Sequence, residues 1–259
     1  MSAPHEIVYG RQPVHELLRA GARQVHDVAA TERAIAAEKW LRDWPGLRLR
    51  VAREREVSQI ADTRDHQGVV AECGTYPYAD AWELASRERP LIVCLDGVTD
   101  PHNLGAVCRS AEAAGATGVV IPERASARVT PAVCKASAGA VEHLPVAVVV
   151  NLARYLEEIK RDDVWIWAVA EGGSAPVWTT DLAAGSVLVC GAEGTGLRPG
   201  VRRACDAVIS IPMHGMIGSL NVSVAAGIVL FEAARQRSGH ASATRATAPT
   251  RPAGETDNG

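Results

Sequence analysis

The hydrophobic pattern changes character near position 90 of this 259-residue chain. From Leu91 onward, short and continuously apolar runs such as LIVCLDG, TGVVIP and LPVAVVV alternate with segments of helical periodicity. Strands that are apolar on both faces and alternate with helices are typical of a parallel sheet covered on both sides. We therefore predict an α/β domain built on a parallel sheet over residues 90–237.

Residues 1–74 alternate shorter helical and extended segments. PVHELLRAG predicts a helix that begins at Pro13 and ends at Gly21, and TERAIAAEKWLRDW predicts an amphipathic helix capped by Thr31. HDVAA, LRLRVA and HQGVVAEC predict strands. We therefore expect a small α/β domain over these residues.

Two segments are predicted to lie outside the domains. The stretch from Gly74 to Pro90 holds two prolines and mixed polarity, so we expect residues 75–89 to form a linker with a short helix around Trp82. Residues 238–259 hold almost no large apolar side chain and are rich in Ala, Thr, Pro and Gly. We expect this C-terminal tail to be disordered.

Composition limits the class of protein. At 47% hydrophobic residues the chain can bury a sizeable core, and no apolar run reaches the roughly 18 to 20 residues of a membrane helix. No N-terminal stretch combines a basic start with an apolar run, so we expect a cytoplasmic protein.

The six cysteines form no CxxC pair, which favours reduced core residues over disulfides or zinc ligands. The eight histidines add no ligand spacing, so no metal is expected.

The net charge of −3 gives no support for a nucleic-acid partner, because basic domains are the usual electrostatic footprint. Local clusters matter more than the net charge. Two clusters stand out, namely Arg48, Arg50, Arg53 and Arg55, and Arg11, Arg19 and Arg23. A solvated face, with Glu54 and Glu56 between the arginines of the first cluster, explains the pattern about as well. Charge alone therefore leaves the partner open.

Three Gly- and Asn-rich segments, each next to an apolar run, are spread over about half the chain, from residue 100 to residue 223. In the first, DPHNLGAVCRS, Asn103 stands where a helix N-cap is expected. Arg109 lies off the apolar stripe of this helix, and Gly105 one turn before it leaves room for a bulky partner. An ordinary capped helix with an exposed arginine is the alternative, and the spacing alone favours it.

The second segment, GAEGTGLRPG, follows the strand VLVC. Its glycines indicate a backbone that approaches a ligand closely, with Glu193 as a polar group beside it. Pro199 stands where the third glycine of a dinucleotide fingerprint belongs, so that kind of site is excluded. A tight turn explains the segment equally well.

The third segment, IPMHGMIGSLNVSVAAGIVLFEAARQ, predicts a strand ending at Pro212, a loop, and a helix entered near Ser219. Ser219 and Asn221 are placed either to cap this helix or to face a ligand at its N-terminus. The helix is apolar on nearly every face over residues 222–231, so we expect it to be buried in a core or a subunit interface.

Taken in this order, the three segments resemble the motifs of the SpoU/TrmH family of RNA ribose 2′-O-methyltransferases. The phrases DGVTDPHNLGAVCRSAEAAG, GAEGTGL and ISIPMHGMIGSLNVSVAAGI carry the resemblance, which covers residues 91–237. YGRQPVHELLRAG and HQGVVAE resemble the L30e-like substrate-binding domain of the branch that methylates a guanosine ribose in 23S rRNA.

The resemblance implies an α/β fold of the SPOUT type, with a deep trefoil knot over about residues 187–231. It also implies a homodimer, with 23S rRNA or a large-subunit assembly intermediate as partner, and S-adenosylmethionine as cofactor. The residues implied for cofactor binding are Gly191, Glu193, Gly194, Ile211, Met213, Ser219 and Leu220. Those implied for catalysis are Arg109, Asn103, Glu193, Ser219 and Asn221.

Several questions stay open at this point. The family assigns the removal of the hydroxyl proton to Arg109, yet arginine is ordinarily always protonated. A cation that stabilises phosphate and alkoxide is the physically simpler role. The target could also be another rRNA position, including an adenosine linked to antibiotic resistance, or a tRNA. A non-catalytic RNA-binding factor for ribosome assembly is the alternative from another class.

Overall fold

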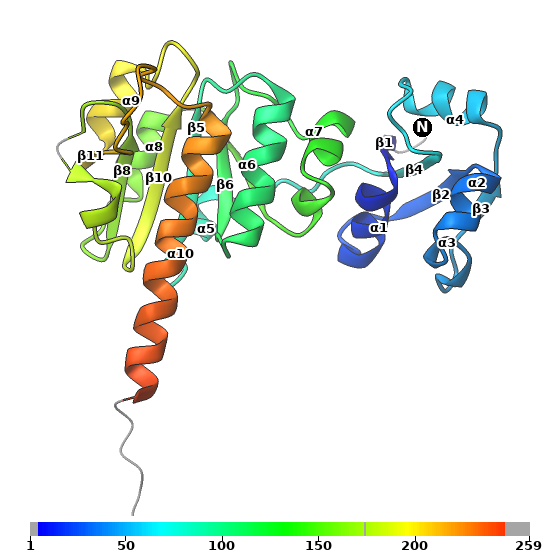
Figure 1. Cartoon of the computed structure of the whole chain (residues 1–259), viewed down its shortest axis with the longest axis horizontal. Helices are drawn as coiled ribbons and strands as arrows, with labels where there is room; N and C mark the ends of the chain where they lie inside the picture. The colour runs from blue at the N-terminus through cyan, green and yellow to red at the C-terminus, as the bar shows by residue number, and fades with distance from the viewer. Residues whose placement is uncertain (1–4, 174, 247–259) are drawn as a thin grey trace, which may run out of the picture.

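The computed structural model describes residues 5–173 and 175–246. A small N-terminal domain lies beside a larger domain that contains a seven-stranded sheet (Figure 1). In the part of the chain that is described, no helix combines the length and the apolar character needed to span a membrane.

The N-terminal domain is built on a four-stranded sheet with the order β1-β4-β2-β3. Its strands are β1 (His5–Tyr9), β2 (Val25–Ala30), β3 (Leu49–Val51) and β4 (Val69–Gly74). Its helices are α1 (Arg11–Ala20), α2 (Glu32–Ala37), α3 (Trp40–Asp43) and α4 (Glu54–Ala61). The three predicted strands and the helix ending at Gly21 are confirmed, whereas β1 and α4 were not predicted.

The single helix predicted after Thr31 is wrong. Thr31 does cap α2, because its Oγ1 accepts a hydrogen bond from the Ala34 amide at 3.2 Å. The helix then stops at Glu38, whose backbone is extended at φ −115° and ψ 96°, and α3 follows as a separate turn. Apolar periodicity continues across this break, so the hydrophobic pattern does not indicate it.

The larger domain contains seven strands in the order β7-β6-β5-β10-β8-β11-β9, and every neighbouring pair is parallel. The parallel α/β prediction is therefore confirmed. Its strands are β5 (Leu91–Asp96), β6 (Gly118–Pro122), β7 (Val146–Val149), β8 (Val164–Val169), β9 (Ala175–Pro176), β10 (Gly185–Gly191) and β11 (Ala207–Ser210).

Helices cover both faces of this sheet, as the continuously apolar strands require. The helices are α5 (Ala81–Ser86), α6 (Pro101–Ala113), α7 (Pro131–Ala136), α8 (Leu152–Glu158), α9 (Pro199–Ala204) and α10 (Val222–Ala246), and η1 (Ala140–Glu142) is a short 3-10 helix. Along β5, Val93 and Leu95 face one core with α6, α7 and α10, whereas Ile92 and Cys94 face a second core with α5, α8 and α9.

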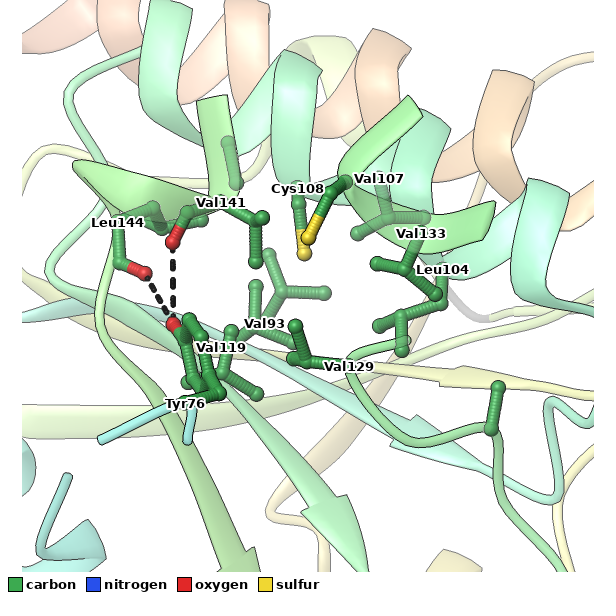
Figure 2. Packing of buried hydrophobic residues seen from close by; sticks show 14 of the residues in the cluster. Tyr76, Val93, Leu104, Val107, Cys108, Val119, Val129, Val133, Val141 and Leu144 are labelled. Carbon is green, nitrogen blue, oxygen red and sulfur yellow. Dashed lines mark hydrogen bonds between the residues drawn. The ribbon is translucent and has the colours of Figure 1, made fainter. Parts of the chain in front are cut away.

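The segment between the two sheets is packed against the larger domain. Figure 2 shows Tyr76 among apolar side chains of that domain, where its hydroxyl lies 3.0 Å from the Val141 carbonyl oxygen and 3.1 Å from that of Leu144. The short helix expected around Trp82 is α5, and the Asp80 side chain caps it by accepting from two backbone amides. This segment is therefore an ordered part of the fold.

The last helix runs further than expected. In Figure 1, α10 crosses the sheet beside α6 and extends past its edge. Because α10 continues to Ala246, the predicted disorder from residue 238 onward is wrong for the residues up to that point. The remainder of the predicted tail lies outside the described residues. The trefoil knot stays a prediction.

Candidate active site

A cleft of about 640 Å³ lies at the carboxyl ends of β8, β10 and β11. This volume falls within the range of roughly 300 to 1,000 Å³ that small-molecule sites occupy. Parallel α/β sheets bind ligands at this edge, because the loops that follow the strands meet there. The cleft contains all seven residues predicted for cofactor binding, namely Gly191, Glu193, Gly194, Ile211, Met213, Ser219 and Leu220.

The second Gly-rich segment folds back on the strand that precedes it. The Gly196 amide donates to the Ala192 carbonyl at 2.9 Å, which closes a tight turn. A Cβ atom added to Gly191 would lie 2.5 Å from the Gly196 oxygen and 2.5 Å from the Leu197 nitrogen. The chain's own turn thus explains why residue 191 is glycine, and close approach of a ligand is not needed to account for it.

The third segment supplies unpaired backbone to the cleft. Within the described residues, no backbone N–H or C=O group of residues 213–220 makes a hydrogen bond, and most of this loop is exposed. Exposed polar groups without internal partners are bound to water in the absence of a ligand. This wall of the cleft can therefore bind a ligand through its main chain.

Asn221 begins the last helix and joins the three segments. Its Oδ1 accepts from the Ser223 amide at 2.9 Å and from the Ser223 hydroxyl at 2.6 Å, so Asn221 is the cap and Ser219 is free to face the cleft. Its Nδ2 donates to Oδ1 of Asn103 at 2.9 Å and also to Oε1 of Glu193. One amide group thus connects the first, second and third motifs.

The first motif differs from the prediction in two respects. The N-cap of α6 is Asp100, whose Oδ1 accepts from the His102 amide at 2.8 Å, so Asn103 lies inside the helix. The space at Gly105 is filled by α7, because an added Cβ would lie 2.5 Å from the Ala136 Cβ. The room predicted there for a bulky partner does not exist.

Arg109 is not brought into the cleft of the single chain. It is exposed on α6, does not line the cleft, and makes no hydrogen bond or ion pair with any described residue. Asn103 lies on the same helix, and its hydrogen bond with the Asn221 amide connects Asn103 to the cleft. The predicted catalytic set is therefore only partly assembled by the geometry of one chain.

Two charged groups at this edge of the sheet were missed. Glu171 lines the cleft after β8, and its carboxylate lies 3.5 Å from the position that a Cβ on Gly218 would take. Asp96 ends β5 almost fully buried, and it accepts from the Arg198 backbone amide at 2.8 Å and from its Nε at 2.7 Å. Acidic residues at the ends of apolar strands were the available signal for both positions.

The thiols contribute no reactive group to the cleft. All six cysteines are unpaired, and five of them are buried. Burial raises the pKa of Cys190, which lines the cleft, to about 12. The predicted core location of the cysteines is confirmed for those five, and a neutral thiol at position 190 is a poor nucleophile or metal ligand. Among the described residues, no group of His, Cys, Asp and Glu is arranged to hold a metal.

The two arginine clusters have different surroundings. Arg48, Arg53 and Arg55 are exposed and make no ion pair with any residue of the described ranges. Every arginine of the second cluster faces a carboxylate, and the pairs are Arg11 with Glu38, Arg19 with Glu16, and Arg23 with Glu142. Only the first cluster therefore presents free positive charge.

Comparison with known proteins gives two family matches. Residues 90–231 match the SpoU rRNA Methylase family, and residues 7–79 match the family described as RNA 2′-O ribose methyltransferase substrate binding. The chain is 47% identical over 180 residues to the 23S rRNA (guanosine-2′-O-)-methyltransferase RlmB of Pseudomonas putida, covering 66% of this chain and 71% of the relative.

Two further similarities extend over nearly the whole chain. RlmB of Escherichia coli is 37% identical over 241 residues, covering 90% of this chain and 99% of the relative. The crystal structure of the SpoU methyltransferase AviRb from Streptomyces viridochromogenes, in complex with AdoMet, superposes with a TM-score of 0.76 at 26% identity, covering 90% of each chain. This chain therefore belongs to the SpoU rRNA methylase family of RNA 2′-O-ribose methyltransferases.

Proposed function

We propose that this protein transfers the methyl group of S-adenosylmethionine to the 2′-hydroxyl of a guanosine ribose in 23S rRNA. The observation that carries the proposal is the Asn221 amide, which joins Asn103 of α6 to Glu193 at the cleft. The names of the relatives from Pseudomonas putida and Escherichia coli support the substrate, and the AdoMet complex of AviRb supports the cofactor.

The residues of the cleft fit S-adenosylmethionine. The unpaired backbone of residues 213–220 offers donors and acceptors for an adenosine, and Val169, Leu197 and Ile211 provide apolar walls. The carboxylates of Glu171 and Glu193 favour a cationic sulfonium over a neutral thioether. We propose that main-chain groups of Gly191, Ile211 and Leu220 hold the cofactor, with Glu193, Gly194, Met213 and Ser219 beside them. When bound, this cofactor supplies an activated methyl group.

The protein's own groups have a limited chemical task. A ribose hydroxyl is a poor nucleophile until it loses its proton, so the site must orient the ribose and favour the alkoxide. We propose that Arg109 remains a cation and contacts a phosphate and the developing alkoxide charge. Asn103, Glu193 and Asn221 hold one another through the shared amide, and Ser219 faces the cleft beside them.

We propose that two copies of the chain form the working enzyme in the cytoplasm. Val224 and Phe231 of α10 are 49% and 52% exposed, although this helix is apolar on nearly every face. Met216 and Ile217 in the cleft loop are exposed as well. A second copy would cover these side chains, and it could bring an Arg109 to a cleft that lacks one in the single chain.

The N-terminal domain would bind the RNA. It matches the family of substrate-binding domains, and its Arg48, Arg53 and Arg55 are free to contact phosphates.

The direct test is a map of ribose methylation in 23S rRNA from cells with and without the gene. We expect one guanosine to lose its 2′-O-methyl group and to regain it when purified protein and S-adenosylmethionine are added to the isolated rRNA. Binding of S-adenosylmethionine by calorimetry is the companion measurement. An unchanged methylation map, with no transfer to rRNA in vitro, would refute the proposal and favour an assembly role.

A further inference from the structure

A buried ion pair joins the two domains. Arg23, from the N-terminal domain, donates through Nε to Glu142 Oε2 at 3.0 Å and through Nη2 to Glu142 Oε1, and each side chain is 1% exposed. The remaining Arg23 Nη1 donates to Glu6 at 3.0 Å. Burial disfavours the charged guanidinium, but hydrogen bonding to Glu142 and the charge of its carboxylate raise the pKa of Arg23. Arg23 therefore stays ionised in the interface.

Two more contacts reach the same short segment, residues 140–144. His143 Nε2 lies 2.7 Å from a carboxylate oxygen of Glu16, which is on α1. The hydroxyl of Tyr76 lies against the carbonyl oxygens of the same segment, as Figure 2 shows. We call the set of Glu16, Arg23, Tyr76, Glu142 and His143 the domain junction. Glu16, Arg23 and Tyr76 thus contact one segment from three separate places in the chain.

The backbones at the junction leave no room for sliding. A Cβ atom added to Gly139 would lie 2.6 Å from the Glu16 Cβ and 3.1 Å from the Pro13 Cα, so α1 rests directly on this turn. Two residues earlier, Ser137 is in contact with α6, because its nitrogen is 3.0 Å from the Cβ position of Gly105. Gly105 is one helical turn from Arg109. Two layers of contact therefore connect the N-terminal domain to the helix that carries Arg109.

The chemistry of the junction favours orientation over stability. A buried ion pair adds little net stability, because the removal of two charges from water offsets their attraction. A bidentate arginine–carboxylate pair does require one relative placement of its partners, since both hydrogen bonds fail together when the groups rotate. An apolar interface of the same area would tolerate small rotations more readily.

We infer that the domain junction is a positioning device, in which Arg23 and Glu142 hold the RNA-binding domain in one orientation relative to α6. RNA bound by the N-terminal domain then meets Arg109 and the cleft at a fixed distance and angle. Arg23 and Glu142 are positioning residues, since neither lines the cleft. This inference rests on the proposed function for its RNA, whereas the fixed orientation can be measured without RNA.

Three variants separate orientation from folding. Glu142→Gln keeps the size of the side chain and removes one charge. The double change Arg23→Met with Glu142→Leu removes both charges and keeps the interface packed, and buried pairs often tolerate such replacement. Arg23→Lys keeps the charge and loses the planar fork. Glu158→Gln is the matched control, because it breaks the exposed pair of Arg154 and Glu158 on α8.

The first measurement is a distance distribution between nitroxide labels on the full chain. Labels at the exposed positions of Glu32→Cys and Asp162→Cys report on the two domains, in a Cys205→Ala background because the other five thiols are buried. Dilution with unlabelled protein removes distances between copies. We expect one narrow distribution for the parent and the control, an intermediate one for Arg23→Lys, and broad ones for Glu142→Gln and the double variant.

The second measurement separates a positioning role from a purely structural one. For an rRNA transcript, we expect kcat/KM to fall by about tenfold or more in Glu142→Gln and the double variant, because misplacement by ~1 Å can cost a hundredfold. The Kd for S-adenosylmethionine should stay within about twofold of the parent.

Two results would overturn the inference. Narrow distributions in all folded variants would show that the pair does not set the orientation. Broad distributions with an unchanged kcat/KM would show that the orientation does not position RNA. If the parent protein methylates no rRNA, the proposed function fails, and the distance measurement still decides whether the junction fixes the domains.

Discussion

The cleft and the domain junction are built from opposite kinds of polar group. Along residues 213–220 the cleft presents backbone groups that have no partner in the described chain, and these residues are mostly exposed. At the junction, Arg23 and Glu142 are buried and satisfy one another. A ligand site needs polar groups that are still available, whereas a domain interface needs groups that are already paired. Substitutions in the cleft and substitutions at the domain junction should therefore impair the protein in different ways.

The largest effect is expected from Arg109. Arg109→Ala should lower methyl transfer by about 10²–10³-fold, the usual result of removing one group that stabilises transition-state charge. The Kd for S-adenosylmethionine should not change, because Arg109 does not line the cleft. The control is Arg124→Ala, another exposed arginine of the same domain. A near-normal single-turnover rate for Arg109→Ala would remove this residue from the mechanism.

The next largest effect concerns the cleft backbone. Gly191→Ala places a Cβ 2.5 Å from backbone atoms of the following turn, so the turn must shift. We expect a loss of about 1–3 kcal/mol in the free energy of unfolding and a clear rise in the Kd for S-adenosylmethionine. Gly200→Ala in α9 is the control, because Gly200 does not line the cleft and the nearest atom to the added Cβ lies 4.0 Å away. Calorimetry and denaturant unfolding of both variants test this, and equal behaviour would contradict it.

Asn221 has two functions that substitution can separate. Asn221→Ala removes the α10 cap, which should lower the free energy of unfolding by about 1 kcal/mol, and it also removes the links to Asn103 and Glu193. Asn221→Asp keeps the cap acceptor but places a carboxylate beside Glu193. We expect near-parental stability at low pH for Asn221→Asp, with methyl transfer impaired in both variants. Full activity of Asn221→Asp would show that the amide link is not required.

The smallest effect is a pH dependence at the junction. Burial opposes the charge of Glu16, but hydrogen bonds from His143 and Arg19 and their charges lower its pKa below the ordinary 4.5. Because the pKa of Glu16 is lower in the folded protein than in the unfolded chain, its ionised carboxylate stabilises the fold above pH 4.5. This stability is lost as the pH falls through the pKa of Glu16 in the folded protein. Between pH 7 and pH 3, the Tm of Glu16→Gln should therefore fall less than that of the parent. A larger fall in the variant would contradict the assigned direction.

Local patterns predicted the sheet well. Runs such as LIVCLDG were recognisable as parallel strands because both of their faces are buried, and the structure places their side chains alternately in two cores. The ends of the helices were harder to predict than the strands. Asp100 followed by Pro101 carries the signal of a cap before a first-turn proline, yet Asn103 was the predicted cap. The break between α2 and α3 at Glu38 could not be predicted, because the apolar periodicity continues across it.

The site was predictable where it depends on segments and unpredictable where it depends on distant pairs. The Gly- and Asn-rich segments indicated which loops form the cleft, because loops after parallel strands converge. The pairing of Arg23 with Glu142 joins residues 119 positions apart, and the sequence pattern groups Arg23 only with Arg11 and Arg19, as a basic cluster. Neither composition nor residue spacing distinguishes an arginine that binds a phosphate from an arginine that forms an ion pair with a carboxylate of another domain.

The position of Tyr76 limits where two such proteins can exchange domains by recombination. It precedes the larger sheet in sequence, yet its ring is buried in that sheet's core and its hydroxyl is bound to residues 141 and 144. A chain cut at Pro90 would lose the Tyr76 ring and leave a cavity in the core cluster that also contains Val93, Val119 and Leu144. Recombination between relatives that carry different RNA-binding domains would therefore have to break upstream of Tyr76, so that the linker is inherited with the catalytic half.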